Sequence, residues 1–411
     1  MFGLNKDSES QSIDFYPSSI FEADTEDHLH TKASAIRPNP FTLPPASSNE
    51  IFRFQTKILA RKIHLNMTSS APNVLVTGSS GHLGHALMLA LQSYGYTPLG
   101  IDIKPSTRAD TLQGSITDRS FIRELLTFRP TIEHIIHTAT LHKPHIGSHT
   151  KEDFISTNIT GTLILLEAAA RHPHQVKSFV FISTTSTFGA ALSPAPGEPA
   201  AWIDEDVAPV PKNIYGATKV AAEDICRLIH VQTGLPAIVL RTSRFFPEED
   251  DDDARRAAMD GDNLKVCELA YRRVDVADVV AACVCALSKA AEGEVRWGRY
   301  IISAPTPFQR DEETLGLLNG DGGEEAIAAL VERCVSGCGD VFAQKGWKHL
   351  SRIDRVYDSS KAVKELGWEP QFTFQAVIER LSRGEDWRSE LTYAVGQRGY
   401  HDVPTGVYTV E

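Results

Sequence analysis

The sequence predicts an α/β fold, with a doubly wound parallel sheet and a smaller carboxyl-terminal lobe. Short apolar runs alternate with helical patterns from residue 71 onward, which is typical of a parallel sheet covered by helices. The first apolar run ends in a glycine-rich turn, and the alternation weakens after Arg244. The weakening indicates a separate lobe over the carboxyl ends of the strands, where ligands bind in such sheets.

The expected strands are short, apolar and β-branched runs that end at turn residues. In chain order they are NVLVT (73–77), YTPLGID (96–102), HIIHTA (134–139), SFVFIS (178–183), AIVLR (237–241) and YIISA (300–304). The expected helices carry apolar residues three and four positions apart. They lie at 82–92, 120–128, 153–170, 215–232 and 274–289. The helix at 153–170 shows the pattern most clearly, with Ile155, Ile159 and Leu163 on one face.

Composition and charge exclude several classes of protein. The chain has 411 residues and a net charge of −12, which argues against nucleic acid as the main partner because phosphates attract basic surfaces. Six cysteines do not make a disulfide framework in a chain of this length, and without a histidine cluster beside them no metal site is expected. No apolar run approaches the ~18 residues that span a bilayer, and no secretory signal is recognisable. We therefore expect a cytoplasmic protein without an integral membrane segment.

Residues 1–70 differ from the rest of the chain. They are rich in Ser, Pro and Asn and show no sustained period, so we expect them to be disordered. The stretch 51–66 is basic and partly amphipathic, which suits a targeting helix or a membrane-surface contact. An alternative is that translation starts at Met67, just before the first expected strand.

The turn after the first strand is the first chemical signal, with glycines at 78, 81 and 84. Gly78 permits the tight turn, Gly81 lets the backbone approach a pyrophosphate, and Gly84 lets the next helix pack closely on the sheet. Asp102 ends the second expected strand, about 20 residues further on, as in dinucleotide-binding units. Its carboxylate accepts hydrogen bonds from a ribose and repels a 2′-phosphate, so the pattern favours NAD over NADP. Lys104 nearby weakens that preference.

Tyr215 and Lys219 are the second chemical signal. They stand four residues apart in an expected helix, so their side chains share one face. A tyrosine with a pKa near ~10 is a poor base at neutral pH, but a neighbouring ammonium group favours the phenolate. Such a pair can remove a hydroxyl proton while hydride leaves carbon for a nicotinamide. Thr184, at the end of an expected strand, can help to hold the substrate oxygen.

Together these segments resemble the extended short-chain dehydrogenase/reductase superfamily, and within it the NAD-dependent epimerase/dehydratase family. The matching segments, in the order of the family, are TGSSGHLG (77–84), Asp102, GSITD (114–118), HTAT (137–140), Asn158, FISTTSTFG (181–189), YGATK (215–219), LRTSRFF (240–246), VDVADV (274–279) and LGWEP (366–370). The resemblance implies an NAD-binding Rossmann domain at 71–243, to which residues 274–305 return. It assigns 244–273 and 306–411 to a substrate-binding lobe.

The resemblance also implies a role for each matching position. Tyr215 would be the acid/base, Lys219 would bind the nicotinamide ribose and tune Tyr215, and Thr184 would complete the catalytic group. NAD would be held by Gly78, Gly81, His82, Leu83, Gly84, Asp102, Ser115, Ile116, Thr138, Ala139, Thr140 and Lys219. Asn158 would support the architecture of the site, with an ordinary core amide as the alternative.

Five residues are expected to bind the substrate. His142 and His145 follow a buried strand and would overhang the nicotinamide, where a histidine assists proton transfer or binds an anion; ordinary surface histidines are the alternative. Arg244 can bind a phosphate or carboxylate with two hydrogen bonds, or pair with the acids that follow it. Thr185 and one of the adjacent arginines at 272 and 273, which we take to be Arg273, complete the set.

These observations predict an NAD-dependent oxidoreductase or isomerase that acts on a hydroxyl or carbonyl carbon, with a nucleotide sugar as the commonest substrate of the family. A 4,6-dehydratase is not expected, because Thr185 and Ser186 stand where those enzymes carry an acidic pair. The alternatives are an alcohol, sterol or carbonyl dehydrogenase/reductase, and a protein that senses NAD(P) without turnover. The family also implies a homodimer through the helices at 153–170 and 215–232.

Overall fold

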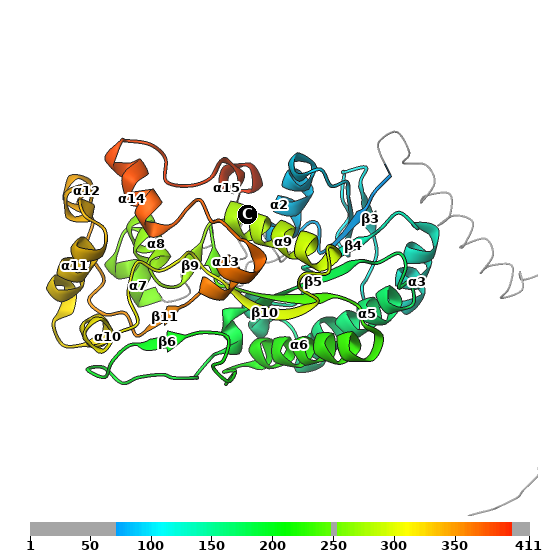
Figure 1. Cartoon of the computed structure of the whole chain (residues 1–411), viewed down its shortest axis with the longest axis horizontal. Coiled ribbons are helices and arrows are strands. Elements are labelled where there is room, and N and C mark those ends of the chain that lie inside the picture. Colours follow the sequence, from blue (N-terminus) through cyan, green and yellow to red (C-terminus); the bar gives the residue numbers. More distant parts are fainter. Residues whose placement is uncertain (1–70, 248–252, 397–411) are drawn as a thin grey trace, which may run out of the picture. The chain divides into compact units, whose positions relative to one another are not determined.

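The computed structural model describes residues 71–247 and 253–396. The expectations for residues 1–70, including the targeting helix and the start at Met67, lie outside the described residues. Seven parallel strands form the central sheet in the order β10-β7-β5-β4-β1-β2-β3 (Figure 1). These strands are β1 (Val74–Thr77), β2 (Pro98–Asp102), β3 (Thr111–Gln113), β4 (His134–His137), β5 (Ser178–Thr184), β7 (Ala237–Thr242) and β10 (Trp297–Ile302).

The strand order confirms the doubly wound fold. The chain runs outward from β1 to β3, crosses back to β4, and then runs outward the other way to β10. The topological switch therefore lies between β1 and β4, where open α/β sheets form their ligand crevice. The strands β1, β4 and β7 are buried along their whole length, because helices cover both faces of the sheet.

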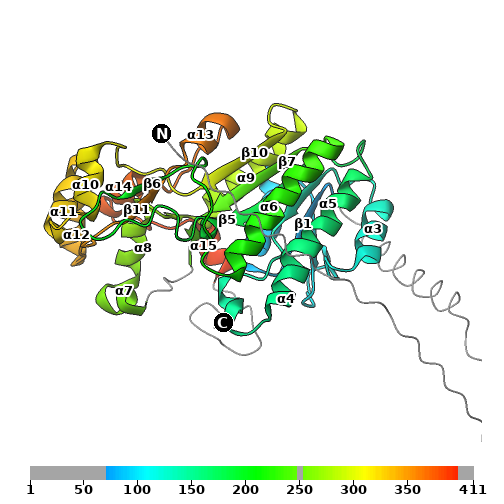
Figure 2. The same ribbon diagram turned by 90° about the horizontal axis from the view of Figure 1, so that it is seen from below.

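Two layers of helices cover the sheet. One face carries α2 (His82–Ala90), η1 (Leu91–Tyr94) and α9 (Val276–Ala291), and the other carries α3 (Arg119–Phe128), α5 (Thr162–Ala170) and α6 (Ile214–Thr233). Figure 2 shows α3, α5 and α6 side by side. Side-chain oxygens of Asp118, Asn213 and Asp275 accept backbone N–H bonds at the starts of α3, α6 and α9, which are the residue types that helix N-caps prefer.

The structure differs from the sequence expectation at three elements. The edge strand β3 was not predicted, because its sequence TLQ is short and carries no apolar run. The long helix expected at 153–170 is instead α4 (Lys151–Phe154), a π-helical segment η3 (Ile155–Gly161) and α5. The helix expected from residue 274 starts at Val276, because Asp275 caps it and Arg273–Val274 form the short strand β9.

Residues outside the sheet form a second apolar cluster. It is built mainly by α8 (Gly261–Leu269), α10 (Glu312–Asn319), α11 (Gly323–Cys334), α12 (Cys338–Lys345) and α14 (Phe374–Ser382). Two small parallel sheets adjoin it: β6 (Ala201–Ile203) pairs with β11 (Arg355–Tyr357), and β8 (Arg244–Phe245) pairs with β9. The remaining helix of this region, α7, spans Asp253–Ala258. These pairings bring segments that are far apart in the sequence to the carboxyl ends of the central strands.

The last described segments return to the sheet. Helices α13 (Ser360–Leu366) and α15 (Glu390–Val395) contribute to the apolar core on the α9 side, together with Trp368. Part of the expected lobe at 306–411 therefore packs with the sheet and not with the second cluster.

Candidate active site

A pocket of about 720 Å³ opens at the carboxyl ends of the central strands. It is lined by loops that follow β1, β2, β4, β5 and β7, and by β8 and β11. Every residue expected to bind the cofactor lines it except Lys219, and every residue expected to bind the substrate lines it except Arg273. The structure thus brings together residues that the sequence scatters over 277 positions, from Gly78 to Arg355.

The glycine loop at one end of the pocket has the shape that a pyrophosphate requires. Gly78 has φ +68°, and a Cβ on it would lie 2.8 Å from the Cα of Ala139. A Cβ on Gly84 would lie 2.0 Å from the carbonyl oxygen of Gly78. Helix α2 begins at His82, directly after this loop, and carries no acidic residue in its first turn. Its N-terminal amides are therefore suited to binding a phosphate.

Asp102 lies at the rim of the same end. Its two carboxylate oxygens accept hydrogen bonds from the backbone N–H of Ser80 and of Lys104, both at 2.9 Å. The acid is thereby tied to the glycine loop, while it remains on the pocket wall with Ser115 and Ile116. The loop, the helix start and the acid fit a dinucleotide with a free ribose.

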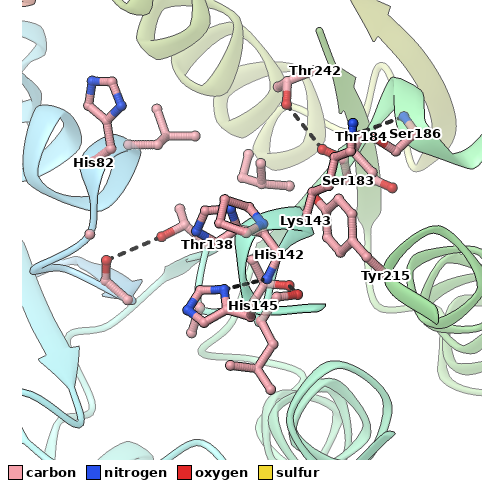
Figure 3. Close-up of a pocket in the computed structure, with 18 of the residues that line it drawn as sticks. His82, Thr138, His142, Lys143, His145, Ser183, Thr184, Ser186, Tyr215 and Thr242 are labelled. Atoms are coloured by element: carbon pink, nitrogen blue, oxygen red, sulfur yellow. Dashed lines mark hydrogen bonds between the residues drawn. The ribbon is translucent and has the colours of Figure 1, made fainter. Parts of the chain in front are cut away.

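Thr184 and Tyr215 lie in the middle of the pocket (Figure 3). Thr184 ends β5, and its hydroxyl oxygen accepts a hydrogen bond of 3.1 Å from the N–H of Ser186. Tyr215 stands in the first turn of α6, just after the cap residue Asn213. The two side chains are 9% and 8% exposed, so a substrate oxygen that reaches them is largely removed from bulk water.

Lys219 lies one helical turn behind Tyr215 and does not line the pocket. Its Nζ donates a hydrogen bond of 2.6 Å to the carbonyl oxygen of Ile182 and lies 4.0 Å from the centre of the Phe181 ring. Burial lowers the pKa of Lys219 to about 7, and the carboxylate of Glu223 partly offsets that effect. Lys219 therefore changes its charge near neutral pH.

Asn158 joins the loop after β4 to helix α6. Its amide oxygen accepts hydrogen bonds from the N–H of Leu141 and the hydroxyl of Thr140, at 2.8 and 2.9 Å. Its amide nitrogen donates to the carbonyl of Leu141 and to the hydroxyl of Thr218. The residue sits in the π-helical segment η3, a deviation that occurs frequently at functional sites. All four hydrogen-bonding positions of the amide are used.

The histidine loop that follows β4 also lines the pocket. The backbone N–H of His142 donates to Nδ1 of His145 at 3.0 Å, and the two ring centres are 4.5 Å apart (Figure 3). This contact is part of the short helix η2 (Lys143–Gly147). His145 is 6% exposed, whereas His142 is half-buried.

A group of arginines surrounds Glu268, which also lines the pocket. Arg244 lies 4.0 Å from this carboxylate, and Arg272 and Arg273 each donate a hydrogen bond to it. Arg244 and Arg272 line the pocket, but Arg273 does not. Arg273 is fully buried, 5.6 Å from the ring of Phe246, because β9 turns its side chain into the core. Of the two adjacent arginines, Arg272 and not Arg273 is therefore placed where a substrate would bind.

Several residues of the pocket wall were not anticipated, among them Lys212, Asp354 and Arg355. Arg355 belongs to β11, which reaches the pocket by pairing with β6, and its guanidinium donates to the carbonyl of Gly189 at 3.3 Å. No local sequence pattern predicts a site role for Arg355, because it reaches the pocket through the pairing of two strands that are far apart in the sequence.

The described ranges contain neither a membrane-spanning helix nor a group of metal ligands. No helix there has the length and apolar character needed to cross a membrane. No three His, Cys, Asp or Glu side chains of those ranges are placed to hold a metal ion.

Comparison with known proteins agrees with this geometry. Residues 74–300 match the model of the NAD dependent epimerase/dehydratase family. The chain is 30% identical over 333 residues to a UDP-glucose 4-epimerase of Rhizobium meliloti, a match that covers 75% of this chain and 95% of that protein. It is 27% identical over 346 residues to a dTDP-glucose 4,6-dehydratase of Streptomyces antibioticus, covering 77% and 92%.

The fold is also similar to that of a solved UDP-glucose 4-epimerase from Brucella ovis in complex with NAD. The TM-score is 0.50 at 20% identity, over 75% of this chain and 96% of that one. The fold and the glycine loop define a Rossmann-type dinucleotide-binding protein of the extended short-chain dehydrogenase/reductase class. The chain belongs to the NAD dependent epimerase/dehydratase family.

Proposed function

We propose that the protein is an NAD-dependent epimerase or dehydrogenase that acts on a nucleotide sugar, with Tyr215 as its acid/base. One observation carries the proposal. Thr184 and Tyr215 line the same pocket as the glycine loop, and Lys219 lies one helical turn behind Tyr215. Cofactor loop and proton-transfer group thus share a single cavity, as hydride transfer requires.

The chemistry follows from these side chains. NAD, when bound, supplies the acceptor for a hydride. Tyr215 takes the proton of the substrate hydroxyl, and Thr184 donates a hydrogen bond to the same oxygen. The ammonium group of Lys219 favours the phenolate form of Tyr215. A return of the proton through Tyr215 after reduction on the opposite face of the sugar gives an epimer, whereas release of the ketone gives net oxidation.

The charge of the pocket favours an anionic substrate. The pocket wall carries six Lys and Arg residues, namely Lys104, Lys143, Lys212, Arg244, Arg272 and Arg355, and four acids, namely Asp102, Asp153, Glu268 and Asp354. An excess of positive charge attracts anions, and the guanidinium group matches the geometry of phosphate oxygens. We assign the arginines around Glu268 to the diphosphate of the substrate, with the histidine loop beside the sugar.

Epimerisation or oxidation is preferred to 4,6-dehydration. The described relatives include both epimerases and dehydratases, so the family alone does not decide. Elimination of water from a sugar needs an additional acid and base beside the reacting carbons. Thr184 is followed by Thr185 and Ser186, whose hydroxyls line the pocket where carboxyl groups would serve that purpose.

A substrate panel tests the proposal. Purified protein is incubated with NAD, or separately with NADP, and with UDP-, GDP- and dTDP-sugars and simple alcohols one at a time. Absorbance of NADH and chromatography of the sugars are followed together. We expect sugar interconversion without net NADH, or NADH formation, and loss of either in Tyr215→Phe. Tyr393→Phe is the matched control, because Tyr393 is 53% exposed and lies outside the pocket.

The other outcomes separate the alternatives. A 4-keto-6-deoxy product would show a dehydratase and overturn the preference for epimerisation. Turnover of simple alcohols alone would favour an alcohol or carbonyl dehydrogenase. NAD binding with no turnover of any compound, and no difference between Tyr215→Phe and the unsubstituted protein, would favour a sensor.

A further inference from the structure

A buried ion cluster lies behind the pocket wall. The carboxylate of Glu223 is fully buried and accepts hydrogen bonds from the hydroxyl of Ser183 at 2.6 Å and from Nη2 of Arg241 at 2.8 Å. Nε of Arg299 lies 3.1 Å from the same carboxylate. None of these residues except Ser183 lines the pocket, so none of the other three has a part in the chemistry proposed above.

The cluster is in register with the catalytic group. On α6, Tyr215, Lys219 and Glu223 follow one another at intervals of four residues and so occupy one face of the helix. On β5, the carbonyl of Ile182 accepts the bond from Lys219, and the hydroxyl of Ser183 donates to Glu223. Thr184 is the next residue of that strand. Two adjacent hydrogen bonds therefore set the position of β5 against α6 where Thr184 faces Tyr215.

Glu223 is also the negative group that balances Lys219. The charged and titratable groups that act on Lys219 include Glu223 and Cys226 on α6 and His137 on β4. Tyr215 lies one turn before it on α6, and Arg241 on β7 and Arg299 on β10 are linked to it through Glu223. Burial raises the pKa of the Cys226 thiol and lowers that of His137, so both are neutral at neutral pH. Glu223 thus faces three cations, namely Lys219 and the two arginines.

We propose that Glu223 is a positioning residue that divides its buried charge between Lys219 and the pair Arg241 and Arg299, and so determines how much of Lys219 stays charged beside Tyr215. This inference rests on the roles proposed for Tyr215 and Lys219. Glu223 contacts neither substrate nor cofactor and acts through Lys219. Arg241 competes with Lys219 for the same carboxylate.

Two substitutions are expected to move Lys219 in opposite directions. Glu223→Gln keeps the shape of the side chain but removes its charge. Because a nearby opposite charge favours the ammonium form, we expect the pKa of Lys219 to fall by about one pH unit or more. Arg241→Met removes a competing cation, so the pKa of Lys219 rises. Ser183→Ala is the matched control: it deletes a hydrogen bond to Glu223 without changing any charge, and the pKa of Lys219 stays close to that of the unsubstituted protein.

The direct measurement needs no substrate. Protein labelled with [13Cε]lysine is titrated by nuclear magnetic resonance without cofactor, and the Lys219 signal is assigned by its loss in Lys219→Arg. Opposite shifts in Glu223→Gln and Arg241→Met support the proposal. An unchanged titration of Lys219 in both folded variants overturns it. If Glu223→Gln does not fold, Glu223→Asp replaces it: the charge remains, so Lys219 titrates almost as before, and Arg241→Met alone must then show the upward shift.

The kinetic measurement separates this inference from the proposed function. In the NAD-bound enzyme, the alkaline limb of kcat against pH reports loss of the Lys219 charge, so it moves to lower pH in Glu223→Gln and to higher pH in Arg241→Met. A purely structural role would lower kcat in both variants without opposite displacements, and that result overturns the proposal. Shifts in the resonance titration together with an inactive unsubstituted protein would overturn only the proposed function.

Discussion

Lys219 combines a buried position with a requirement for charge. Its side chain is 2% exposed, and its Nζ is held by the carbonyl of Ile182 and the ring of Phe181. Removing an ammonium group from water costs free energy of folding unless an opposite charge compensates it, and Glu223 is shared with Arg241 and Arg299. At this residue, stability and the proposed activity are therefore in conflict, as is common at functional sites.

Replacement of Lys219 by methionine is expected to stabilise the protein while it abolishes turnover. The folded-state pKa of about 7 lies below the unfolded value of 10.5, so the unfolded chain binds the proton more tightly and the cost of charge burial is fully present below pH 7. That cost declines as the pH rises from 7 towards 10. We expect Lys219→Met to raise Tm at pH 6 to 7, by roughly 2–4 °C for each kcal/mol regained, and by less at pH 9.5. Differential scanning calorimetry at these pH values measures the effect, and a gain that grows with pH would contradict the account.

The glycine loop allows a matched pair of substitutions. Gly78 and Gly95 have φ of +68° and +82°, so alanine is strained at both by about 1–2 kcal/mol. A Cβ on Gly78 would lie 2.8 Å from the backbone of Ala139, whereas a Cβ on Gly95 meets nothing within 4 Å. Both variants should lose stability, Gly78→Ala more because of this contact, but only Gly78→Ala should bind NAD at least ~10-fold more weakly, a loss of about 1.4 kcal/mol. Isothermal titration calorimetry measures the NAD affinity of each variant. Equal affinities in the two variants would count against a pyrophosphate site at this loop.

The candidate site was predictable where a local pattern carries the chemistry. The spacing of Tyr215 and Lys219 and the glycines at 78, 81 and 84 can be recognised in the sequence because a single helix or turn sets their geometry. Arg355 could not be predicted, because the pairing of β11 with β6 brings it to the pocket. The choice between adjacent arginines was wrong for Arg273, since the direction of a two-residue strand decides which side chain faces the pocket.

At the scale of elements, helix α9 anchors the last described part of the chain. Asp275 caps α9 and also accepts bonds from the N–H and hydroxyl of Ser389, at 3.0 and 2.6 Å. Asp278 accepts the N–H groups of Gln371 and Phe372, at 2.8 and 2.9 Å. Two buried carboxyl groups thus hold α15 and the segment before α14 against the helix that covers the sheet.

Asp278 makes this attachment dependent on pH. Burial raises the pKa of Asp278 from 3.8 to about 7, so the folded state binds its proton more tightly than the unfolded state. The stabilising effect of the neutral carboxyl is full below about pH 4 and is lost as the pH rises through 7. We expect the free energy of unfolding of the unsubstituted protein, measured relative to Asp278→Asn, to fall by up to about 1.4 kcal/mol per pH unit between pH 5 and 7. Urea denaturation at pH 5, 6, 7 and 8 measures it, and a difference that is flat or rises with pH would contradict this account.

The elements themselves were predictable to different degrees. Strands β1, β4, β5 and β7 each contain an apolar run, because parallel strands covered on both faces bury nearly all of their side chains. Strand β3 lies at the edge of the sheet and is mostly half-buried, so it needs no such run and gives no signal. The π-helical turn at η3 was not predictable either, because its hydrogen-bond pattern follows from the fixed position of Asn158 against the β4 loop and α6.

At the scale of the whole molecule, one face presents apolar side chains that no described segment covers. Ile155 in η3 is 45% exposed, and Leu228 and Val231 in α6 are 51% and 72% exposed. Segments η3 and α6 lie side by side (Figure 2), and Leu228 and Val231, three residues apart, share one side of α6. Exposed apolar side chains on adjacent helical segments are typical of an association surface, and the homodimer that the sequence resemblance implies stays a prediction for these segments.

A double substitution tests this surface. A two-fold dimer buries the same patch on both subunits, so Leu228→Glu with Val231→Glu places two charges on each side and should convert the dimer to a monomer. Val363→Glu is the matched control, because Val363 is 39% exposed on α13, a helix that packs on α9 and β10. Size-exclusion chromatography with multi-angle light scattering at micromolar concentration measures the mass. We expect a dimer for the unsubstituted protein and for Val363→Glu and a monomer for the double variant; a monomeric unsubstituted protein, or a double variant that remains dimeric while folded, would show that these helices do not form the interface.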